Sequence, residues 1–275
     1  YEHLIQSKFD RKDLLIALGG GVVGDLTGYA AATYLRGIGF IQMPTSLLAM
    51  VDSSIGGKTG VDFLAYKNMI GAFHQPKSVY MNLGALTTID SRQFYAGMAE
   101  IIKHGLIKDV SYYNWLKDHI AEINDHNMDV MKEMIYRSCM IKKEVVEKDP
   151  KELGDRALLN FGHTIGHAIE KLMNFQLLHG ECVAVGMVAA CYISYKRGYI
   201  SKNDLEDIIS LIRNYELPIQ ISGLEVEEIF QATTLDKKME SGKLKFILLS
   251  NIGKAFIDIS VTREELMEGI QFILK

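Results

Sequence analysis

Cysteine is scarce in this sequence. Its 275 residues contain three cysteines, Cys139, Cys182 and Cys191, an odd number without the paired spacing of a zinc-binding motif. A disulfide framework is therefore not expected to hold the fold together. We expect the thiols to pack as small apolar groups in a reducing compartment such as the cytoplasm.

An excess of basic charge and a long apolar run are also lacking. Lysine and arginine number 30 against 34 acidic residues, and the net charge of −4 offers no electrostatic reason to bind nucleic acid or a membrane surface. The apolar stretch from Val183 to Ile193 is too short to span a bilayer, and the first residues do not resemble a signal peptide. A hydrophobic content of 48% predicts a soluble globular protein with one large domain or two smaller ones.

Histidine, by contrast, is concentrated between Asn160 and Glu181. Three of the eight histidines fall there: His163 and His167 are four residues apart, and His179 follows after a break. On a helix the first two lie on one face. A catalytic zinc typically takes three protein ligands, and neutral imidazole is a common one. The cluster favours a metal or catalytic site over the alternative of ordinary hydrogen-bonded helix histidines.

A glycine-rich loop follows the first expected strand, Leu14–Leu18. Residues 19–25 fit the pattern Gly-x-Gly-x-x-Gly and lead into a helical stretch through Ala32. Such a loop can hold a pyrophosphate at a helix N-terminus. The acid that would bind a ribose about twenty residues further on is lacking, and the nearest later acid is Asp52. A nucleotide-binding loop and a tight strand-to-helix turn without a ligand both stay open.

A second glycine-rich segment surrounds Lys58. The run Gly57-Lys58-Thr59 is similar to the end of an ATP-binding P-loop, but Asp52 stands where that motif requires its first glycine. A P-loop ATPase is therefore disfavoured. A lysine flanked by glycines still suits a phosphate or carboxylate ligand, and Lys67 and Asn68 add a cation and an amide shortly after.

The segment from Gly97 to Gly105 contains a carboxylate in apolar surroundings. On a helix, Glu100, Lys103 and His104 share one face. A carboxylate in such a setting is costly unless it is paired or bound to a metal. An exposed ion pair between Glu100 and Lys103 is the alternative.

From Ser91 onward the pattern changes from strands to helices. We therefore expect a boundary near residue 92, between an α/β domain at 1–92 and a mainly α-helical domain at 93–275. The closing helix begins with a capping box of Thr262 and Glu265. The other expected elements are strands at Gly39–Met43 and Ser78–Asn82, helices at Tyr112–Asn124, Asp129–Glu147, Val183–Arg197, Glu206–Arg213, Glu225–Ala232 and Thr262–Leu274, and a β-hairpin of Leu244–Leu249 with Lys254–Ile259.

Together these motifs resemble those of the 3-dehydroquinate synthase family of sugar phosphate cyclases. They occur in the family's order over nearly the whole chain, and the combination is far more specific than a single glycine loop. The segments that carry the resemblance are Ala17–Gly28, Val51–Thr59, Lys67–Phe73, Gly97–Lys103, Asn160–Ala168 and His179–Glu181.

The resemblance implies a Rossmann-like N-terminal domain that binds NAD and a helical C-terminal domain that binds zinc or cobalt. It implies conversion of 3-deoxy-D-arabino-heptulosonate 7-phosphate to 3-dehydroquinate and phosphate, a lyase step of the shikimate pathway in aromatic amino acid biosynthesis. Glu100, His163 and His179 would be the metal ligands, and His167 would serve the substrate and its proton chemistry instead.

The remaining expected site residues fall into two groups. We expect the NAD site to comprise Gly21, Val22, Val23, Gly24, Asp25, Thr45, Ser46, Asp52, Lys58, Lys67, Thr87 and Thr88. The resemblance implies that the substrate is met by Arg36, Asp52, Lys58, Asn68, Lys103, Lys142, Arg156, Asn160 and His167, with Lys237 or Lys238 as a further phosphate ligand.

Members of the family also carry a further segment before the position of Tyr1, with a motif that contacts the adenosine half of the cofactor. We therefore expect either a fragment or a true start further upstream, and an incomplete NAD site. The resemblance also implies a homodimer. The competing interpretations are a sister sugar phosphate cyclase, a metal-dependent polyol dehydrogenase, and a non-catalytic metal- or nucleotide-binding protein.

Overall fold

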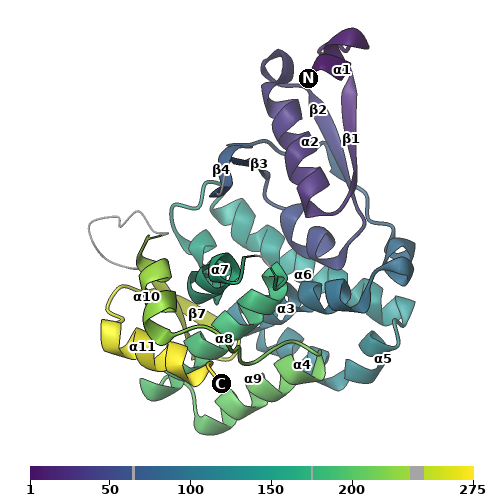
Figure 1. Cartoon of the computed structure of the whole chain (residues 1–275). Helices are drawn as coiled ribbons and strands as arrows, with labels where there is room; N and C mark the ends of the chain where they lie inside the picture. The colour runs from purple at the N-terminus through teal and green to yellow at the C-terminus, as the bar shows by residue number, and fades with distance from the viewer. Residues whose placement is uncertain (64–65, 175, 236–244) are drawn as a thin grey trace.

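The computed structural model of the protein describes residues 1–63, 66–174, 176–235 and 245–275. The N-terminal part contains a parallel sheet, and the C-terminal part is mostly helical (Figure 1), as the sequence predicts. The boundary near residue 92 stays a prediction; helix α3 (Ser91–Lys108) begins beside it.

The parallel sheet orders its described strands as β1, β2 and β5. Strand β1 (Leu14–Gly19) pairs with β2 (Gly39–Pro44) in a register that sets Leu14 opposite Gly39, and β2 pairs with β5 (Ser78–Val79). The third strand is therefore shorter than the predicted Ser78–Asn82. Helix α2 (Gly21–Thr33) makes the crossover that two parallel neighbours require.

Glycines bring α2 close to its neighbours. A Cβ added at Gly24 would lie 2.7 Å from Oε1 of Gln42 on β2, and one added at Gly28 would lie 2.4 Å from Cγ2 of Thr59. Side chains larger than hydrogen would therefore push the helix away. This packing keeps the first turn of α2 at the carboxyl ends of β1 and β2, the edge where open α/β sheets bind ligands.

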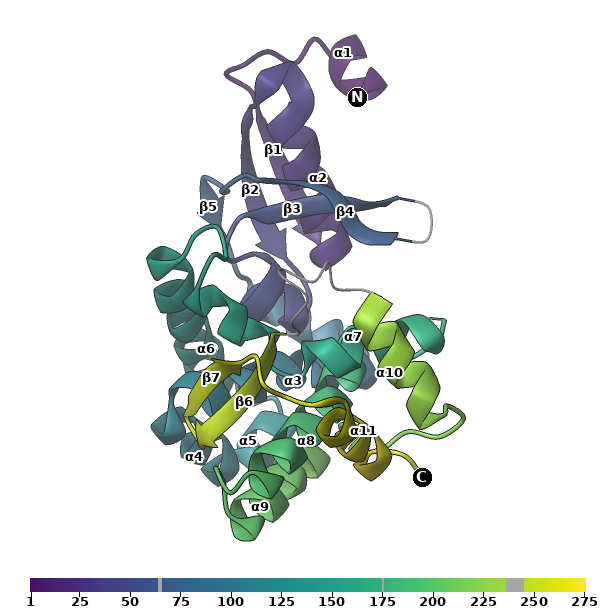
Figure 2. The same cartoon turned by 90° about the vertical axis from the view of Figure 1, so that its left-hand side faces the viewer.

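The segment between β2 and β5 contains two features that the sequence did not predict. The stretch Ala49–Ser53 forms a short π-helix (η2), and Lys58–Phe63 (β3) pairs antiparallel with Tyr66–Phe73 (β4). Figure 2 shows this hairpin crossing in front of the sheet and helix α2, above most of the helical part. The lysine that was expected in a glycine-rich loop, Lys58, thus begins a strand.

Helices α3 and α8 (His179–Lys196) form the centre of the C-terminal part. All residues of α3 from Ala96 to Ile107 are buried, as are those of α8 from Cys182 to Cys191. Asp90 caps α3 by accepting hydrogen bonds from the backbone N–H groups of Arg92 and Gln93. A helix that is apolar on all sides is stable only when other elements surround it. Helix α8 is such a helix and packs against α3, α7, α9, α11 and β6.

The predicted helix Asp129–Glu147 and the capping box of Thr262 and Glu265 are confirmed. The predicted helix Tyr112–Asn124 is instead two, because the backbone leaves helical geometry at His119. The predicted Val183–Arg197 helix begins earlier, at His179.

Among the described residues, no helix combines the length and apolar character needed to cross a bilayer. The remaining elements are α1 (Glu2–Gln6), η1 (Tyr34–Arg36), η3 (Leu83–Thr88), α4 (Val110–Asp118), α5 (Ile120–Asn124), α6 (Met128–Lys148), η4 (Asp155–Asn160), α7 (His163–Leu172), α9 (Lys202–Asn214), α10 (Val226–Leu235), β6 (Phe246–Asn251), β7 (Lys254–Asp258) and α11 (Arg263–Phe272).

Candidate active site

A cavity of about 480 Å³ lies where the hairpin β3–β4, the segment η2 and the helices α3, α6, α7 and α8 meet. Its walls combine cations, carboxylates and histidines with a few apolar side chains. It brings together residues that are far apart in the sequence. The predicted site residues that line it are Asp25, Asp52, Lys58, Lys103, Lys142, Arg156, Asn160, His163, His167 and His179.

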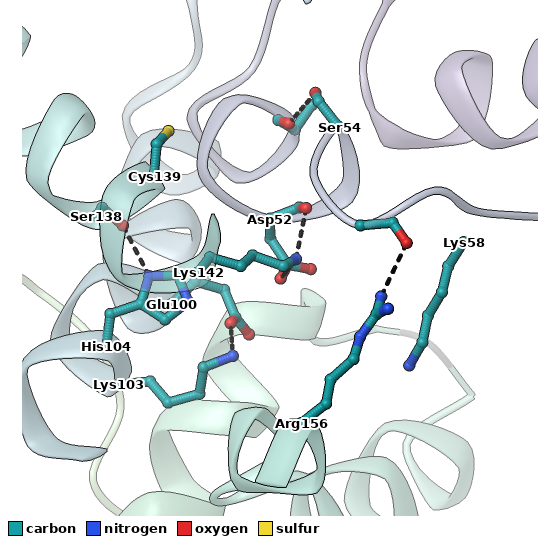
Figure 3. A network of polar contacts seen from close by, with 12 residues as sticks. Asp52, Ser54, Lys58, Glu100, Lys103, His104, Ser138, Cys139, Lys142 and Arg156 are labelled. Atoms are coloured by element: carbon teal, nitrogen blue, oxygen red, sulfur yellow. Dashed lines mark hydrogen bonds and ion pairs between the residues drawn. The ribbon is translucent and has the colours of Figure 1, made fainter. Parts of the chain in front are cut away.

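The carboxylate of Glu100 lies fully buried among two histidines and a lysine. Within the described part of the chain its Oε1 has no hydrogen-bond partner, and it faces Nε2 of His163 at 3.5 Å and Nε2 of His179 at 3.7 Å. Its Oε2 accepts a hydrogen bond from Lys103 (Figure 3). Burial alone would raise the pKa of Glu100, but Lys103 and the two histidines outweigh it and hold the pKa well below its usual value. The alternative of an exposed ion pair between Glu100 and Lys103 is therefore wrong, because both side chains are buried.

Helix packing places these groups. A Cβ added at Gly180 would lie 1.8 Å from the carbonyl oxygen of Ala96, so α3 and α8 touch through their backbones beside His179. Glu100 stands one turn after Ala96 on α3 and therefore faces the start of α8. Arg92 clamps the same two helices by donating to both carboxylate oxygens of Glu181, at 2.6 and 2.7 Å.

The two histidines that face Glu100 are held at their other ring nitrogen. Nδ1 of His163 lies 3.1 Å from the carbonyl oxygen of Phe161, and Nδ1 of His179 lies 3.5 Å from Oε2 of Glu170. An acceptor at Nδ1 keeps the hydrogen of a neutral imidazole on that nitrogen. The lone pair is then on Nε2, which is directed at Glu100. A buried oxygen without a partner and two imidazole nitrogens directed at it are a fitting set of donors for a divalent cation.

The three histidines also form a geometric group of their own. One ligand atom each from His163, His167 and His179 lies within 4.8 Å of the others. His167 is exposed on the cavity wall, whereas Glu100 is buried beneath it. A cation held by Glu100, His163 and His179 would therefore leave His167 directed at a molecule in the cavity.

An ion pair from two distant segments stands beside this cluster. Lys142 on α6 is buried, pairs with the carboxylate of Asp52 on η2, and donates a second hydrogen bond to the Asp52 carbonyl oxygen at 2.5 Å (Figure 3). Although burial alone would raise the pKa of Asp52, Lys142 lowers it to about 2. Burial lowers the pKa of Lys142 in turn, because it disfavours the ammonium form.

A second group of cations faces the hairpin. The guanidinium of Arg156 is buried and donates to the carbonyl oxygens of Pro150 at 2.6 Å and Gly56 at 3.0 Å. Lys58 forms an ion pair with Glu152, whose other oxygen accepts a hydrogen bond from Nδ2 of Asn160 at 2.6 Å. The Glu152 carboxylate thus lies between two residues, Lys58 and Asn160, that the family resemblance assigns to an anionic substrate.

The glycine loop reaches the cavity at Asp25. Burial and the neighbouring Asp52 raise the pKa of Asp25 to about 7. The loop itself packs on the segment after β2: the N–H of Thr45 donates to the carbonyl oxygen of Gly19 at 2.9 Å. A Cβ added at Gly20 would lie 3.6 Å from Oγ of Ser46, so the two segments predicted to bind NAD lie side by side. Val22 and Val23 in the same loop are exposed.

Some predicted site residues are not brought to the cavity. Arg36 is exposed at the amino end of β2, opposite the end where the glycine loop lies, and Thr87 and Thr88 are exposed on η3. Among the described residues these three do not line the cavity. The side chains of Lys67 and Asn68, and all of Lys237 and Lys238, lie outside the described part of the chain.

Several residues of the site were not predicted from the sequence, and three of them are polar side chains close to the predicted groups. Glu152 and Ser53 line the cavity, and Glu170 lies behind His179. Glu170 had a usable signal, because it follows His163 by seven residues, two turns of one helix face. Glu152 stands in a loop with a φ of 59° and had no such signal.

The fold and the site define a class: two-part α/β proteins in which a cluster fit for a divalent cation faces a cavity that is lined by lysines and an arginine and reached by a glycine loop. Sequence models of the same family match both parts, one described as 3-dehydroquinate synthase N-terminal at residues 1–96 and one as 3-dehydroquinate synthase C-terminal at 97–239. The chain belongs to the 3-dehydroquinate synthase family.

Individual relatives agree with this assignment. The 3-dehydroquinate synthase of Acetivibrio thermocellus is 47% identical over 271 residues, which cover 98% of this chain and 75% of that protein. Among solved structures, ValA, the 2-epi-5-epi-valiolone synthase of Streptomyces hygroscopicus with NAD+ and Zn2+ bound, is 28% identical with a TM-score of 0.93, covering 99% of this chain and 76% of its own. A 2-deoxy-scyllo-inosose synthase complexed with carbaglucose-6-phosphate, NAD+ and Co2+ is 28% identical with a TM-score of 0.90, covering 98% and 76%.

Proposed function

We propose that this protein converts 3-deoxy-D-arabino-heptulosonate 7-phosphate into 3-dehydroquinate and phosphate. One observation carries the proposal: the unpartnered Oε1 of Glu100 faces two histidine nitrogens at a cavity that is also lined by Lys58, Lys142 and Arg156. A reaction that expels phosphate from a sugar acid needs a metal-type centre and several fixed cations in one place.

Glu100, His163 and His179 would hold a zinc or cobalt ion. The loop from Gly21 to Asp25, with Thr45 and Ser46, would hold NAD at the carboxyl edge of the sheet, where backbone N–H groups of α2 face an anion. When bound, the ion would acidify a substrate hydroxyl, and NAD would accept a hydride from that carbon and later return it.

The chain's own side chains would bind and orient the substrate. Asn160 and four cations line the cavity. Lys58 and Arg156 lie on one side of the view in Figure 3 and Lys103 and Lys142 on the other, so a phosphate and a carboxylate can both be held. Fixed cations offset the charge of the leaving phosphate at no cost of reorganisation. The carboxylates of Asp52 and Glu152 are already paired with Lys142 and Lys58, so the substrate's own phosphate is a suitable acceptor for the proton that leaves with it.

The test is a phosphate assay and an NADH trace on one sample of purified protein supplied with NAD and the heptulosonate phosphate. We expect stoichiometric phosphate release without net NADH, because the hydride returns to the substrate. A chelator should abolish release, and added zinc should restore it. Stoichiometric accumulation of NADH, or phosphate release that persists after complete removal of metal, would show that the chemistry is different.

A sister cyclase is the nearest alternative, because the two solved relatives act in other cyclisations. Arg156, Asn160 and His167 at the cavity favour a substrate with a carboxylate. Turnover of the heptulosonate phosphate, and none of a sugar phosphate without the carboxylate such as glucose 6-phosphate, separates the two functions.

Two further proposals concern the protein in the cell. A homodimer rests on the family resemblance, and light scattering of the purified protein tests it. A place in the cytoplasm is supported by Cys139, Cys182 and Cys191, which are all free thiols.

A further inference from the structure

We propose that Glu170 is a positioning residue of the metal centre, one that fixes His179 and strengthens it as a ligand. The inference rests on the proposed function, because it needs a metal at Glu100, His163 and His179. It assigns a role to a buried carboxylate that does not line the cavity and has no direct place in the chemistry.

The first step is the position of Glu170. It stands near the end of α7, is 4% exposed, and directs Oε2 at Nδ1 of His179 from 3.5 Å. Its partner is on another helix, at the first residue of α8, so the contact joins the two helices that carry the histidine ligands. A buried carboxylate is costly unless it is paired, and here it faces a histidine that also faces Glu100.

The second step is the orientation of the ring. With Nδ1 of His179 turned to Glu170, the hydrogen of a neutral imidazole belongs on Nδ1, and the Nε2 lone pair points at Oε1 of Glu100, 3.7 Å away. Without Glu170 neither the tautomer nor the rotation of the ring is fixed from behind. Carboxylates behind metal-binding histidines commonly serve this purpose.

The third step is a difference between the two histidines. Nδ1 of His163 faces the neutral carbonyl oxygen of Phe161, at 3.1 Å, whereas Nδ1 of His179 faces an anion. A carboxylate acceptor makes the imidazole more basic than a carbonyl does. His179 is therefore the stronger donor of the pair, and its strength depends on one replaceable side chain. The backbone acceptor of His163 cannot be removed by substitution.

The experiment measures metal binding rather than turnover. The metal-free protein is titrated with Zn2+ in competition with a chromophoric chelator, for the wild type, Glu170→Gln and Glu170→Ala. Glutamine keeps the shape and an oxygen acceptor but removes the charge; alanine removes both. We expect the zinc dissociation constant to rise about tenfold in Glu170→Gln and about a hundredfold in Glu170→Ala, the range found when such outer partners are lost.

A second readout separates positioning from simple loss of stability. The visible absorption of the Co2+ form reports ligand geometry, and it should shift in both variants. Glu133→Gln is the matched control, because it makes the same change of charge at an exposed position of α6. The control should bind Zn2+ as the wild type does, with the same Co2+ spectrum. If metal-free Glu170→Ala does not fold, as judged by circular dichroism, Glu170→Gln carries the test alone.

The role of Glu170 and the metal centre itself are overturned by different results. Wild-type zinc affinity and an unchanged Co2+ spectrum in Glu170→Gln would overturn the role of Glu170 and leave the proposed metal centre in place. A wild-type protein that binds neither Zn2+ nor Co2+ would overturn the centre itself, and the role of Glu170 with it.

Discussion

Replacing Gly180 by alanine tests how the two central helices hold the metal-type cluster. The new Cβ would lie 1.8 Å from the carbonyl oxygen of Ala96 and 2.6 Å from its carbonyl carbon. An ordinary contact needs about 3.4 Å, so α3 and α8 must separate by about 1.6 Å at this point. Both partners are helix backbone, and no flexible side chain can yield.

Separation of α3 and α8 lowers the free energy of unfolding and also changes the distance between Glu100 and His179. Overpacking of this kind costs on the order of 1–3 kcal/mol, and backbone contacts belong at the upper end. The cluster lies within one turn of the contact: Glu100 follows Ala96 on α3, and His179 precedes Gly180 on α8. Moving the helices apart lengthens the 3.7 Å between Oε1 of Glu100 and Nε2 of His179, so one ligand would be lost from a shared ion.

Urea unfolding and Zn2+ titration of the metal-free Gly180→Ala protein measure the two effects. We expect a loss of about 3 kcal/mol in the free energy of unfolding and at least a tenfold weaker affinity for zinc. Gly20→Ala is the control, since its added Cβ would meet only Oγ of Ser46, at 3.6 Å. It should leave the zinc affinity unchanged and lower the stability only by the preference for glycine over alanine at the N-cap of α2. Wild-type stability and zinc affinity in Gly180→Ala would refute the view that this contact sets the geometry of the cluster.

Three further outcomes are expected. Lys142→Ala and Arg156→Ala should each lower turnover by roughly 30- to 1000-fold, because a charge-assisted contact to the phosphate or carboxylate is lost; near-normal rates in both would contradict their placement. The pKa of Asp25 is raised to about 7, so the folded protein keeps a proton that the unfolded chain, at the ordinary 3.8, has released. Stability should thus fall by on the order of 4 kcal/mol between about pH 4 and pH 7, and Asp25→Asn should flatten this slope in denaturation curves; an equal slope in the variant would rule Asp25 out as its source. Thr262→Ala should lower the free energy of unfolding by about 1 kcal/mol through the lost cap of α11 and leave zinc affinity unchanged, and an unchanged unfolding midpoint would argue against the capping role.

Local patterns were enough to predict much of the fold. The apolar runs that became β1 and β2, the amphipathic period of α6 and the capping box of α11 each depend on neighbours in the sequence. The hairpin β3–β4 was missed because its glycines indicate a loop. A Cβ added at Gly71 would lie 2.3 Å from the carbonyl oxygen of Thr59, so these glycines permit a close approach of two strands, which only the paired structure reveals.

The site was predictable only in part, because sequence patterns connect residues that are near one another in the chain. Spacing alone favoured His163, His167 and His179, three residues near one another in the chain. Glu100 comes from a different helix, and only the family resemblance connected it with the histidines. Glu152 reaches its partners through a loop whose path no periodicity describes.

The carboxylate of Glu152, held between Lys58 and Asn160, turns ligand entry into an exchange. An anion that binds on this side of the cavity must displace the Glu152 carboxylate from Lys58 and Asn160. This carboxylate is part of the protein and is therefore always present at high effective concentration. The apparent affinity of a phosphate or carboxylate inhibitor then equals the difference between two free energies: that of the inhibitor bound to Lys58 and Asn160, and that of Glu152 bound to the same two side chains. Inhibitors ranked by charge alone would be ranked poorly here, because shape and reach decide which anion wins.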